Sequence, residues 1–365
     1  MTMTEDTTMA AEVTVLNPGG GVFQKMSEVE PEAVEWTVPG LIPNGEITLL
    51  CGDGGVGKGL FTAQLVTYVT TGRTSELFPA AREQPGNVVI LTGEDSVDAV
   101  LYPRLKAVEA DFEKIQVAAS NYYYRRTGKT PYLDDDSLWV RIESVNPSLV
   151  VIDPIQSFLP PNINMNNRQQ MRGLLQKLQG MAQECGFSLL LVMHTNKGAG
   201  ASGRNRLNGT ADLWDAARSV LMMGHELNGD RVYLSNEKNS YSEPAQTMLF
   251  TVETVEIEKG MKAARLAFDE TTERRDADFV RERPEKAAGK SKVVQRMILS
   301  VLSESPERKM ESVALKNEVI AQIGCSGSTY DHARSALTKD GLIRNEKQGK
   351  GYTTLNQDRA TVRVA

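Results

Sequence analysis

A glycine-rich segment that contains a single lysine is the part of this sequence whose residue types point most directly to chemistry. It lies between an apolar run and a stretch with apolar residues at helical spacing. Glycines let consecutive backbone N–H groups turn toward phosphate oxygens, the following helix start adds partial positive charge, and the lysine can reach the β- and γ-phosphates. We therefore expect a nucleotide phosphate site made of Gly52, Asp53, Gly54, Gly55, Val56, Gly57, Lys58, Gly59 and Leu60.

The position after the lysine departs from the usual form of such a loop. A Ser or Thr that holds magnesium normally stands there, whereas this chain has Gly59. The metal must then rest on Asp153, on water and on the nucleotide itself, because Thr62 lies one helical turn further on. The sequence predicts ATP hydrolysis with a weakened affinity for Mg²⁺.

Three polar side chains follow other apolar runs that indicate buried strands. Asp153 is placed to orient hydrated Mg²⁺, although an aspartate at a strand end can also cap the next loop. Glu94 or Asp95 could polarise the attacking water, and the strand-end position favours Glu94. His194 can sense the γ-phosphate and pass the signal to the loop that follows. We expect these residues to act with Lys58 in catalysis, with Asp153 as the metal ligand.

Alternating strands and helices must position these side chains. Near-continuous apolar strands between helical patterns predict a parallel sheet covered on both faces, an α/β fold. Such sheets bind ligands at the carboxyl ends of their strands. The patterns predict helices over residues 97–109 and 211–219, further strands over 220–223, 231–236, 248–255 and 264–268, and an irregular surface stretch over 118–137.

The C-terminal part of the chain has a different character. Residues 274–292 are charged and indicate a linker, and residues 290–356 resemble a winged helix, with three helices followed by a hairpin with a basic tip. A winged helix implies contact with duplex DNA or a partner protein. The expected contact residues are Ser328, Thr329, His332 and Arg334 of the third helix, and Lys347 and Lys350 of the wing.

Charge is distributed unevenly along the chain. Residues 281–365 hold 16 basic and 10 acidic residues, a net of +6, and the other 280 residues hold 25 basic and 37 acidic ones, a net of −12. A basic module on an acidic body is common where the module meets nucleic acid, and a solvated basic surface is the alternative.

Composition indicates a globular cytoplasmic protein without membrane contact. The 365 residues are 40% hydrophobic, which is enough for a large domain and a small one. The sequence lacks an apolar run near the ~18 residues of a membrane span, and residues 1–21 lack a signal-peptide pattern. Three cysteines without paired spacing fit a reducing compartment.

Several of these segments together resemble a known family. Residues 42–46, 52–59, 92–95, 150–153 and 192–197 are similar to the RecA-like ATPases of the RepA-type hexameric replicative helicases, which plasmids, phages and bacterial mobile elements encode. The similarity spans residues 34–255. It implies a RecA-like core, assembly of identical subunits into a hexameric ring with ATP between them, and single-stranded DNA in the central channel.

The resemblance also implies roles for particular residues. It assigns Glu94 as the catalytic carboxylate and His194 as the phosphate sensor. An arginine finger supplied in trans would be Arg218, unless this arginine pairs with Asp212 or Asp215 on a helix surface, and Lys238 is a second candidate for contacting phosphates. DNA would contact the loops over residues 162–168 and 197–206, the second through Lys197, Arg204 and Arg206.

The sequence thus predicts five regions and one leading function. The regions are a flexible leader (1–33), a RecA-like ATPase domain (34–270), a charged linker (271–290), a winged-helix-like domain (291–356) and a tail (357–365). The leading function is an ATP- and Mg²⁺-dependent DNA helicase or translocase in replication of a plasmid, phage or mobile element. The alternatives are a helicase-loading or recombinase-like ATPase without unwinding, and an ATP-switched DNA-binding regulator.

Overall fold

The computed structural model describes residues 25–195, 203–207, 212–226, 231–282, 286–346 and 351–356. Residues 1–35 and 36–365 form two separate units. In the first unit, the 3-10 helix η1 (Met26–Glu28) is exposed. Most of the predicted leader lies outside the described residues, so it stays a prediction.

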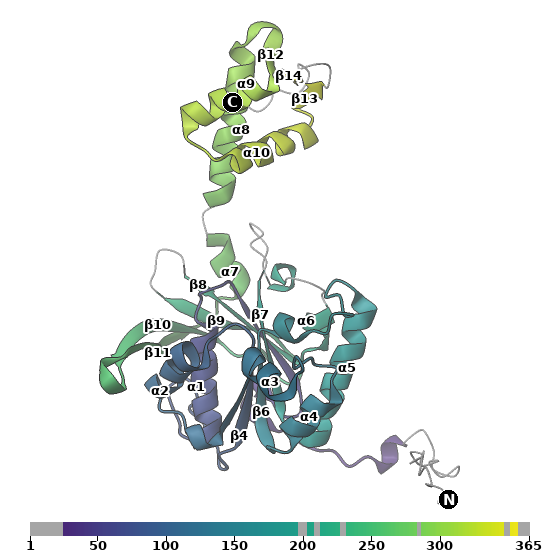
Figure 1. The fold of residues 1–365 in the computed structure, drawn as a ribbon, viewed down its shortest axis with the longest axis vertical. Helices are drawn as coiled ribbons and strands as arrows, with labels where there is room; N and C mark the ends of the chain where they lie inside the picture. Colours follow the sequence, from purple (N-terminus) through teal and green to yellow (C-terminus); the bar gives the residue numbers. More distant parts are fainter. Residues whose placement is uncertain are drawn as a thin grey trace, which may run out of the picture. The chain divides into compact units, whose positions relative to one another are not determined.

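The main sheet of the second unit has nine strands, in the order β11-β10-β9-β8-β3-β7-β6-β4-β5 (Figure 1). Six are parallel: β3 (Ile47–Gly52), β4 (Asn87–Thr92), β5 (Ile115–Ala119), β6 (Pro147–Asp153), β7 (Ser188–His194) and β8 (Ser219–His225). Three antiparallel strands extend it: β9 (Val232–Asn239), β10 (Thr247–Glu256) and β11 (Lys262–Thr272). Every residue of β3 is buried, as expected for a strand covered on both faces. The predicted α/β fold with a parallel-centred sheet is confirmed.

Helices cover both faces of this sheet (Figure 1). One face packs against α1 (Lys58–Thr71) and α2 (Tyr102–Ala107), and the other against α3 (Ser120–Thr127), α4 (Asp136–Glu143), α5 (Arg168–Cys185) and α6 (Asp212–Ala216). The connections contain three short 3-10 helices, η3 (Phe112–Lys114), η4 (Ile155–Phe158) and η5 (Gly203–Arg206). A small antiparallel pair of strands, β1 (Trp36–Val38) and β2 (Ile42–Pro43), precedes the main sheet in the chain.

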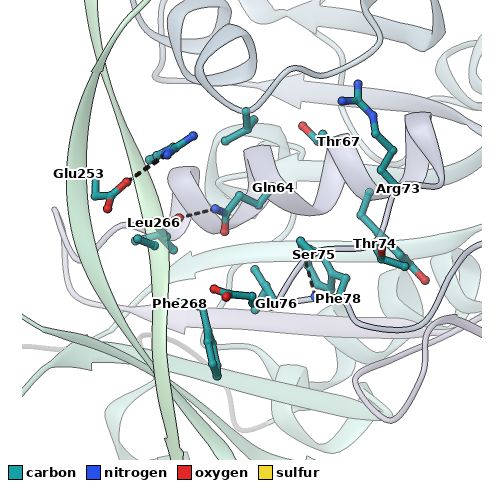
Figure 2. Close-up of a pocket in the computed structure, with 15 residues that line it drawn as sticks. Gln64, Thr67, Arg73, Thr74, Ser75, Glu76, Phe78, Glu253, Leu266 and Phe268 are labelled. Carbon is teal, nitrogen blue, oxygen red and sulfur yellow. Dashed lines mark hydrogen bonds and ion pairs between the residues drawn. The ribbon is translucent and has the colours of Figure 1, made fainter.

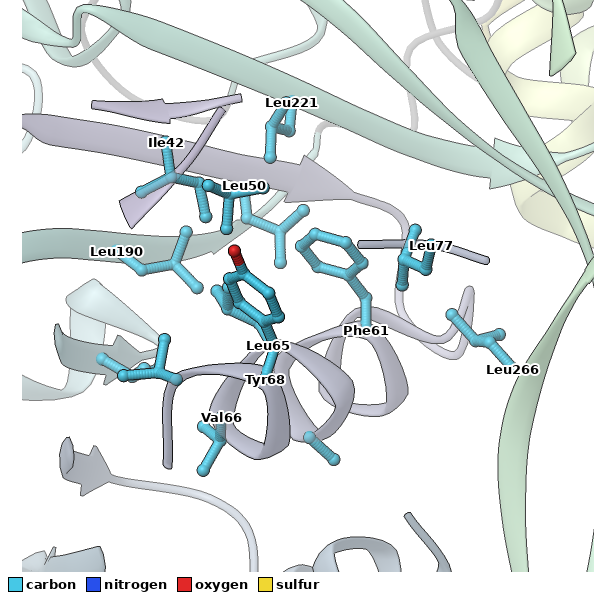
Figure 3. Packing of buried hydrophobic residues seen from close by; sticks show 14 of the residues in the cluster. Ile42, Leu50, Phe61, Leu65, Val66, Tyr68, Leu77, Leu190, Leu221 and Leu266 are labelled. Atoms are coloured by element: carbon cyan, nitrogen blue, oxygen red, sulfur yellow. The ribbon is translucent and has the colours of Figure 1, made fainter. Parts of the chain in front are cut away.

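The helix that follows the glycine-rich loop is held firmly by apolar packing. Phe61, Leu65 and Tyr68 of α1 are buried with Leu50 of β3 and Leu190 of β7 (Figure 3). Burying each such side chain contributes about 1.5–3 kcal/mol. The loop therefore joins two rigid elements, a central strand and a well-packed helix.

One local prediction is wrong and another is confirmed in outline. Residues 118–137 are not irregular, because they contain the end of β5, all of α3 and the start of α4. Only Tyr123 of α3 is buried, so this helix carries little signal of core packing. The helix predicted over 97–109 is present as far as residue 107, as a π-helical segment, η2 (Val97–Leu101), that continues directly into α2, which carries Pro103 in its first turn. Proline has no N–H to donate, which fits a change of hydrogen-bond register at this point.

The predicted linker is also partly wrong. It contains α7 (Asp276–Glu282) and the start of α8 (Lys286–Glu304). Phe279 of α7 is buried, and its ring stacks on Tyr233 of β9 with centroids 4.1 Å apart. Helix α7 thus packs on the nine-stranded sheet.

The C-terminal residues form three helices and a three-stranded antiparallel sheet. The order along the chain is α8, η7 (Pro306–Arg308), β12 (Lys309–Glu311), α9 (Ser312–Ile323), α10 (Gly327–Lys339), β13 (Ile343–Glu346) and β14 (Tyr352–Leu355). The sheet order is β12-β14-β13. The predicted helices and hairpin of a winged-helix-like domain are present, and β12 is an added strand of three residues. None of the described helices combines the length and the hydropathy needed to cross a bilayer.

Candidate nucleotide site

The glycine-rich loop connects β3 to α1 and encloses the lysine ammonium. Gly55 and Gly57 have φ values of 80° and 93°, a conformation that residues with a Cβ seldom adopt. The Nζ of Lys58 donates hydrogen bonds to the carbonyl oxygens of Gly52 and Asp53, both at 2.9 Å. The lysine is thus already folded back over the loop that would bind phosphate.

Neighbouring strands bring the other predicted catalytic residues to the same place. Asp153 and His194 end β6 and β7, and Glu94 follows β4. His194 Nδ1 is 3.3 Å from the Nζ of Lys58, and its Nε2 is 3.6 Å from a carboxylate oxygen of Glu94. The three residues predicted from strand ends therefore meet Lys58 at one edge of the parallel sheet.

Burial and charge shift two pKa values in this site. Burial, and then the charges of Asp95 and Glu94, raise the pKa of Asp153 to about 6, whereas Lys58 and His194 oppose the shift. Burial lowers the pKa of Lys58 from its usual value, and the nearby Asp153 partly offsets this change. A bound cation beside Asp153 would favour its ionised form.

A pocket of about 420 Å³ opens over these residues. It is lined by the phosphate loop and by Glu94, Asp95, Arg104, Asp153, His194 and residues 262–264 of β11. This volume lies within the usual range for ligand sites, and its polar wall suits a nucleotide.

The same pocket offers limited support for a metal ion. Among the described residues, no three or more His, Cys, Asp or Glu side chains form a metal-binding group. Mg²⁺ would therefore be held by Asp153 together with nucleotide phosphates and water, where it would neutralise charge on the phosphates.

Arg218 lies away from this pocket. Its backbone N–H donates to the carbonyl of Ile47, the first residue of β3, and its guanidinium is 3.8 Å from Glu46 rather than paired with Asp212 or Asp215. Parallel strands place Ile47 at the edge of the sheet opposite to Lys58. Arg218 is thus outside the site of its own chain, and its role in trans stays a prediction.

Lys238, the second candidate for that role, is occupied within its own chain. Its Nζ donates to the carbonyl oxygens of Trp214, Asp215 and Ala217, at the end of α6. Burial, and then the charge of Arg218, lower its pKa. The ammonium would have to leave three carbonyl acceptors to reach a phosphate.

One predicted DNA contact is corrected by the structure. Arg206 is buried at 3% exposure, and it pairs with Asp276 of α7 and with Asp53 of the phosphate loop, 3.3 Å away. It is not available to DNA. Arg204 is half-exposed and pairs with Asp215 at 2.6 Å, and Lys197 lies outside the described residues.

Four of the predicted contact residues of the C-terminal domain lie on α10. Ser328 and His332 are exposed, and Thr329 is half-buried. The backbone N–H of Thr329 donates to the side chain of Ser326, which caps this helix. Arg334 donates to the side chain of Asn345 at 2.8 Å. Lys347 and Lys350 lie outside the described residues.

Sequence reasoning missed one charged pair in the nucleotide pocket. The Nη1 atom of Arg104, a residue of α2, lies 2.5 Å from a carboxylate oxygen of Asp95. Its presence at the phosphate loop depends on the path of η2 and α2, which no pattern in the sequence specified. The unusual Gly59 was the available signal that some other group fills this space.

A larger pocket, of about 560 Å³, lies elsewhere on the second unit, beside α1 and β11 (Figure 2). Its walls come from α1, the loop after it and β11, and the side chain of Gln64 donates to the carbonyl of Leu266 at 2.5 Å. Neither Lys58 nor the strand-end carboxylates line it. It is therefore separate from the phosphate site.

Comparisons with known proteins agree with this geometry. Residues 18–200 match the family described as AAA domain. The chain is 23% identical over 206 residues to the DNA repair protein RadA of Streptococcus pneumoniae. The aligned residues make up 55% of this chain and 41% of that protein. RadA of Streptococcus pyogenes serotype M6 is 23% identical over 175 residues, 47% of this chain and 33% of its own length. The chain thus spans well under half the length of these relatives.

Among solved structures, the chain matches a KaiC-like protein from the hyperthermophilic archaeon Pyrococcus horikoshii. The identity is 19% and the TM-score is 0.43, over 65% of this chain and 100% of that one.

Proposed function

This chain belongs to the AAA domain family of P-loop ATPases, and from that premise we propose that it couples ATP hydrolysis to movement on DNA, as a helicase or translocase. The observation that carries the proposal is the contact series from Lys58 through His194 to Glu94, with distances of 3.3 and 3.6 Å. It joins the group that would hold the γ-phosphate to the group that would activate water.

The proposed reaction uses each residue at a stated atom. Phosphate oxygens would draw Lys58 Nζ away from its carbonyl acceptors. A carboxylate oxygen of Glu94 would accept a proton from water as the water oxygen bonds to the γ-phosphorus and the bond to the ADP oxygen breaks. His194, in contact with both residues, would respond to the loss of the γ-phosphate. Thr195, the next residue, donates a hydrogen bond to Asp53, so the segment after β7 begins at the phosphate loop.

The location of Arg218 supports assembly of identical subunits, with a hexameric ring as the proposed form. Its side chain is 48% exposed at the edge of the sheet opposite to Lys58. A residue at that edge could reach the nucleotide of a neighbouring copy, whereas it does not reach its own.

The test is ATP hydrolysis by the full-length protein with and without single-stranded DNA. We expect DNA to stimulate turnover, and Lys58→Ala to reduce it by about 100-fold or more. Lys106→Ala is the matched control, since Lys106 pairs with Glu258 at 3.4 Å outside the pocket. Turnover that single-stranded DNA leaves unchanged would contradict the motor.

A recombinase-like ATPase without unwinding is the second candidate, and the similarity to proteins named DNA repair protein RadA favours it. Unwinding of a forked duplex supports the motor, whereas DNA-stimulated ATPase with strand exchange and no unwinding supports the recombinase. An ATP-switched regulator would instead bind duplex DNA in a nucleotide-dependent way with almost no turnover.

A further inference from the structure

Gly59 is the residue of the phosphate loop that departs from the usual pattern, and its surroundings give a reason. A Cβ built on Gly59 would lie 2.5 Å from Nη1 and 3.3 Å from Cζ of Arg104. Real Cβ atoms do not approach another heavy atom so closely. The guanidinium of Arg104 therefore fills the space into which a Ser or Thr side chain would project at this position.

An ion pair holds Arg104 in this place. Its Nη1 is 2.5 Å from a carboxylate oxygen of Asp95, and its side chain is 29% exposed. Both residues line the pocket that also contains Lys58 and Asp153. An arginine remains charged at every pH at which the protein is folded, so Arg104 adds a permanent positive charge to a pocket that Lys58 and Lys262 also line.

The other charges of the pocket make such a cation useful. Glu94, Asp95 and Asp153 all line it, and each would repel an entering triphosphate. In most phosphate loops a hydroxyl helps to hold Mg²⁺, and the metal provides the compensating charge. This loop has no hydroxyl next to Lys58, and Arg104 reaches the same space with a fixed positive charge and a planar set of N–H donors.

We propose that Arg104 is a phosphate-binding residue of this nucleotide site, which stands in for the missing loop hydroxyl and lets the protein hold ATP with little help from Mg²⁺. The proposal rests on the proposed ATPase function of the same pocket. It assigns to Gly59 the role of leaving room for the guanidinium.

Equilibrium binding of the fluorescent nucleotide mant-ATP to the full-length protein tests this role without measuring turnover. Titrations are run in excess Mg²⁺ and in EDTA. In EDTA, we expect Arg104→Gln to weaken binding by about 10- to 100-fold and Arg104→Lys to weaken it less. Arg73→Gln is the matched control, because Arg73 pairs with Glu109 at 2.9 Å away from this pocket, and it should bind as the unmodified protein does.

Variants of Gly59 test whether the guanidinium of Arg104 needs the space that this glycine leaves open. Gly59→Ala adds only a Cβ, which must displace the guanidinium, so it should weaken binding in EDTA. Gly59→Ser should weaken binding in EDTA equally but recover it in Mg²⁺, because the serine restores a hydroxyl for the metal. In an Arg104→Gln background, Gly59→Ala should have no further effect, since the group that it displaces is already gone.

The possible results separate this inference from the function on which it rests. If the unmodified protein binds mant-ATP in neither buffer, the ATPase proposal and this inference both fail. If it binds, and Arg104→Gln binds as tightly in EDTA, Arg104 does not contact phosphate and the inference alone is overturned. Additive losses from Gly59→Ala and Arg104→Gln would overturn it as well.

Discussion

His194 lies between a cation and a carboxylate, and this position determines which ring nitrogen of the neutral imidazole carries the proton. Lys58 can only donate, so Nδ1 of His194 must accept from it at 3.3 Å. In the neutral ring, Nε2 then carries the proton and faces Glu94 at 3.6 Å. The imidazole thus connects Lys58, the proposed phosphate-binding residue, to Glu94, the proposed catalytic carboxylate, because Nδ1 accepts on one side and Nε2 faces the carboxylate as a donor on the other.

Glu94→Gln should separate ATP binding from hydrolysis. An amide keeps the size of the side chain but cannot accept a proton from water, so we expect kcat to fall by about 100- to 10,000-fold. Binding of mant-ATP should stay within about threefold, as measured by fluorescence titration. Glu109→Gln changes an exposed glutamate outside the pocket and serves as the control. A kcat close to that of the unmodified protein would transfer the role to Asp95.

His194→Gln tests whether the histidine transmits the nucleotide state. We expect ATP binding to be retained and the stimulation of turnover by single-stranded DNA to be lost, because the contact between Lys58 and Glu94 would no longer be continuous. His225→Gln, at the end of β8, is a matched histidine at another strand end. Full DNA stimulation in the His194 variant would show that the ring is structural.

At the scale of elements, Arg206 ties the segment after β7 to two other parts of the core. Its guanidinium bonds Asp276 of α7 and Tyr233 of β9, and it lies 3.3 Å from Asp53 of the phosphate loop. Tyr233 also donates to Asp276, at 2.7 Å. The start of α7 is thereby fixed through side chains that reach the nucleotide site.

Breaking this buried pair should destabilise the protein strongly. Arg206→Met leaves the fully buried Asp276 without its cation, which typically costs about 3–5 kcal/mol of unfolding free energy. Arg204→Met removes the exposed pair with Asp215 and should cost about 1 kcal/mol or less. Urea unfolding of both variants measures the difference, and equal losses would contradict the structural role of Arg206.

The sequence predicted the elements that have strong patterns and missed those that depend on tertiary contacts. Continuous apolar strands located the sheet and placed Lys58, Glu94, Asp153 and His194 at one edge of it. Helix α3 was missed because a single residue of it is buried, and α7 because its charged residues suggested a linker while Phe279 packs on Tyr233. Arg206 was assigned to DNA as a basic residue of a loop that the family resemblance places near DNA, since a buried partner 70 residues away leaves no local signal.

At the scale of the whole chain, the described hydrophobic residues fall into separate cores. The clusters that pack on the main sheet end at Phe279, and a separate cluster, from Val294 to Leu355, holds the C-terminal helices and strands together. Neither core takes a buried residue from the other. We therefore expect the two proposed functions, ATP hydrolysis and duplex binding, to be removable one without the other.

Deletion of residues 285–365 should therefore spare the ATPase and remove binding to duplex DNA. The deletion keeps α7 and takes away a module of net charge +5, with 14 basic and 9 acidic residues, which leaves a body of net negative charge that repels phosphates. ATP turnover and fluorescence anisotropy with a labelled duplex at moderate salt give the two readouts. Unaltered duplex affinity in the truncated protein would mean that the C-terminal domain is not the DNA reader.

A pair of single substitutions in the full-length chain locates the contact within that domain. His332→Glu puts a negative charge on the exposed surface of α10, and Gln322→Glu puts the same charge on the exposed surface of α9. Neither position belongs to the C-terminal core, so both variants should fold and hydrolyse ATP normally. If α10 enters a groove of the duplex, the charge beside the DNA phosphates should weaken binding by about tenfold or more, whereas the charge on α9 should change it far less. Equal losses for both variants would indicate nonspecific attraction to the whole basic module rather than docking of α10.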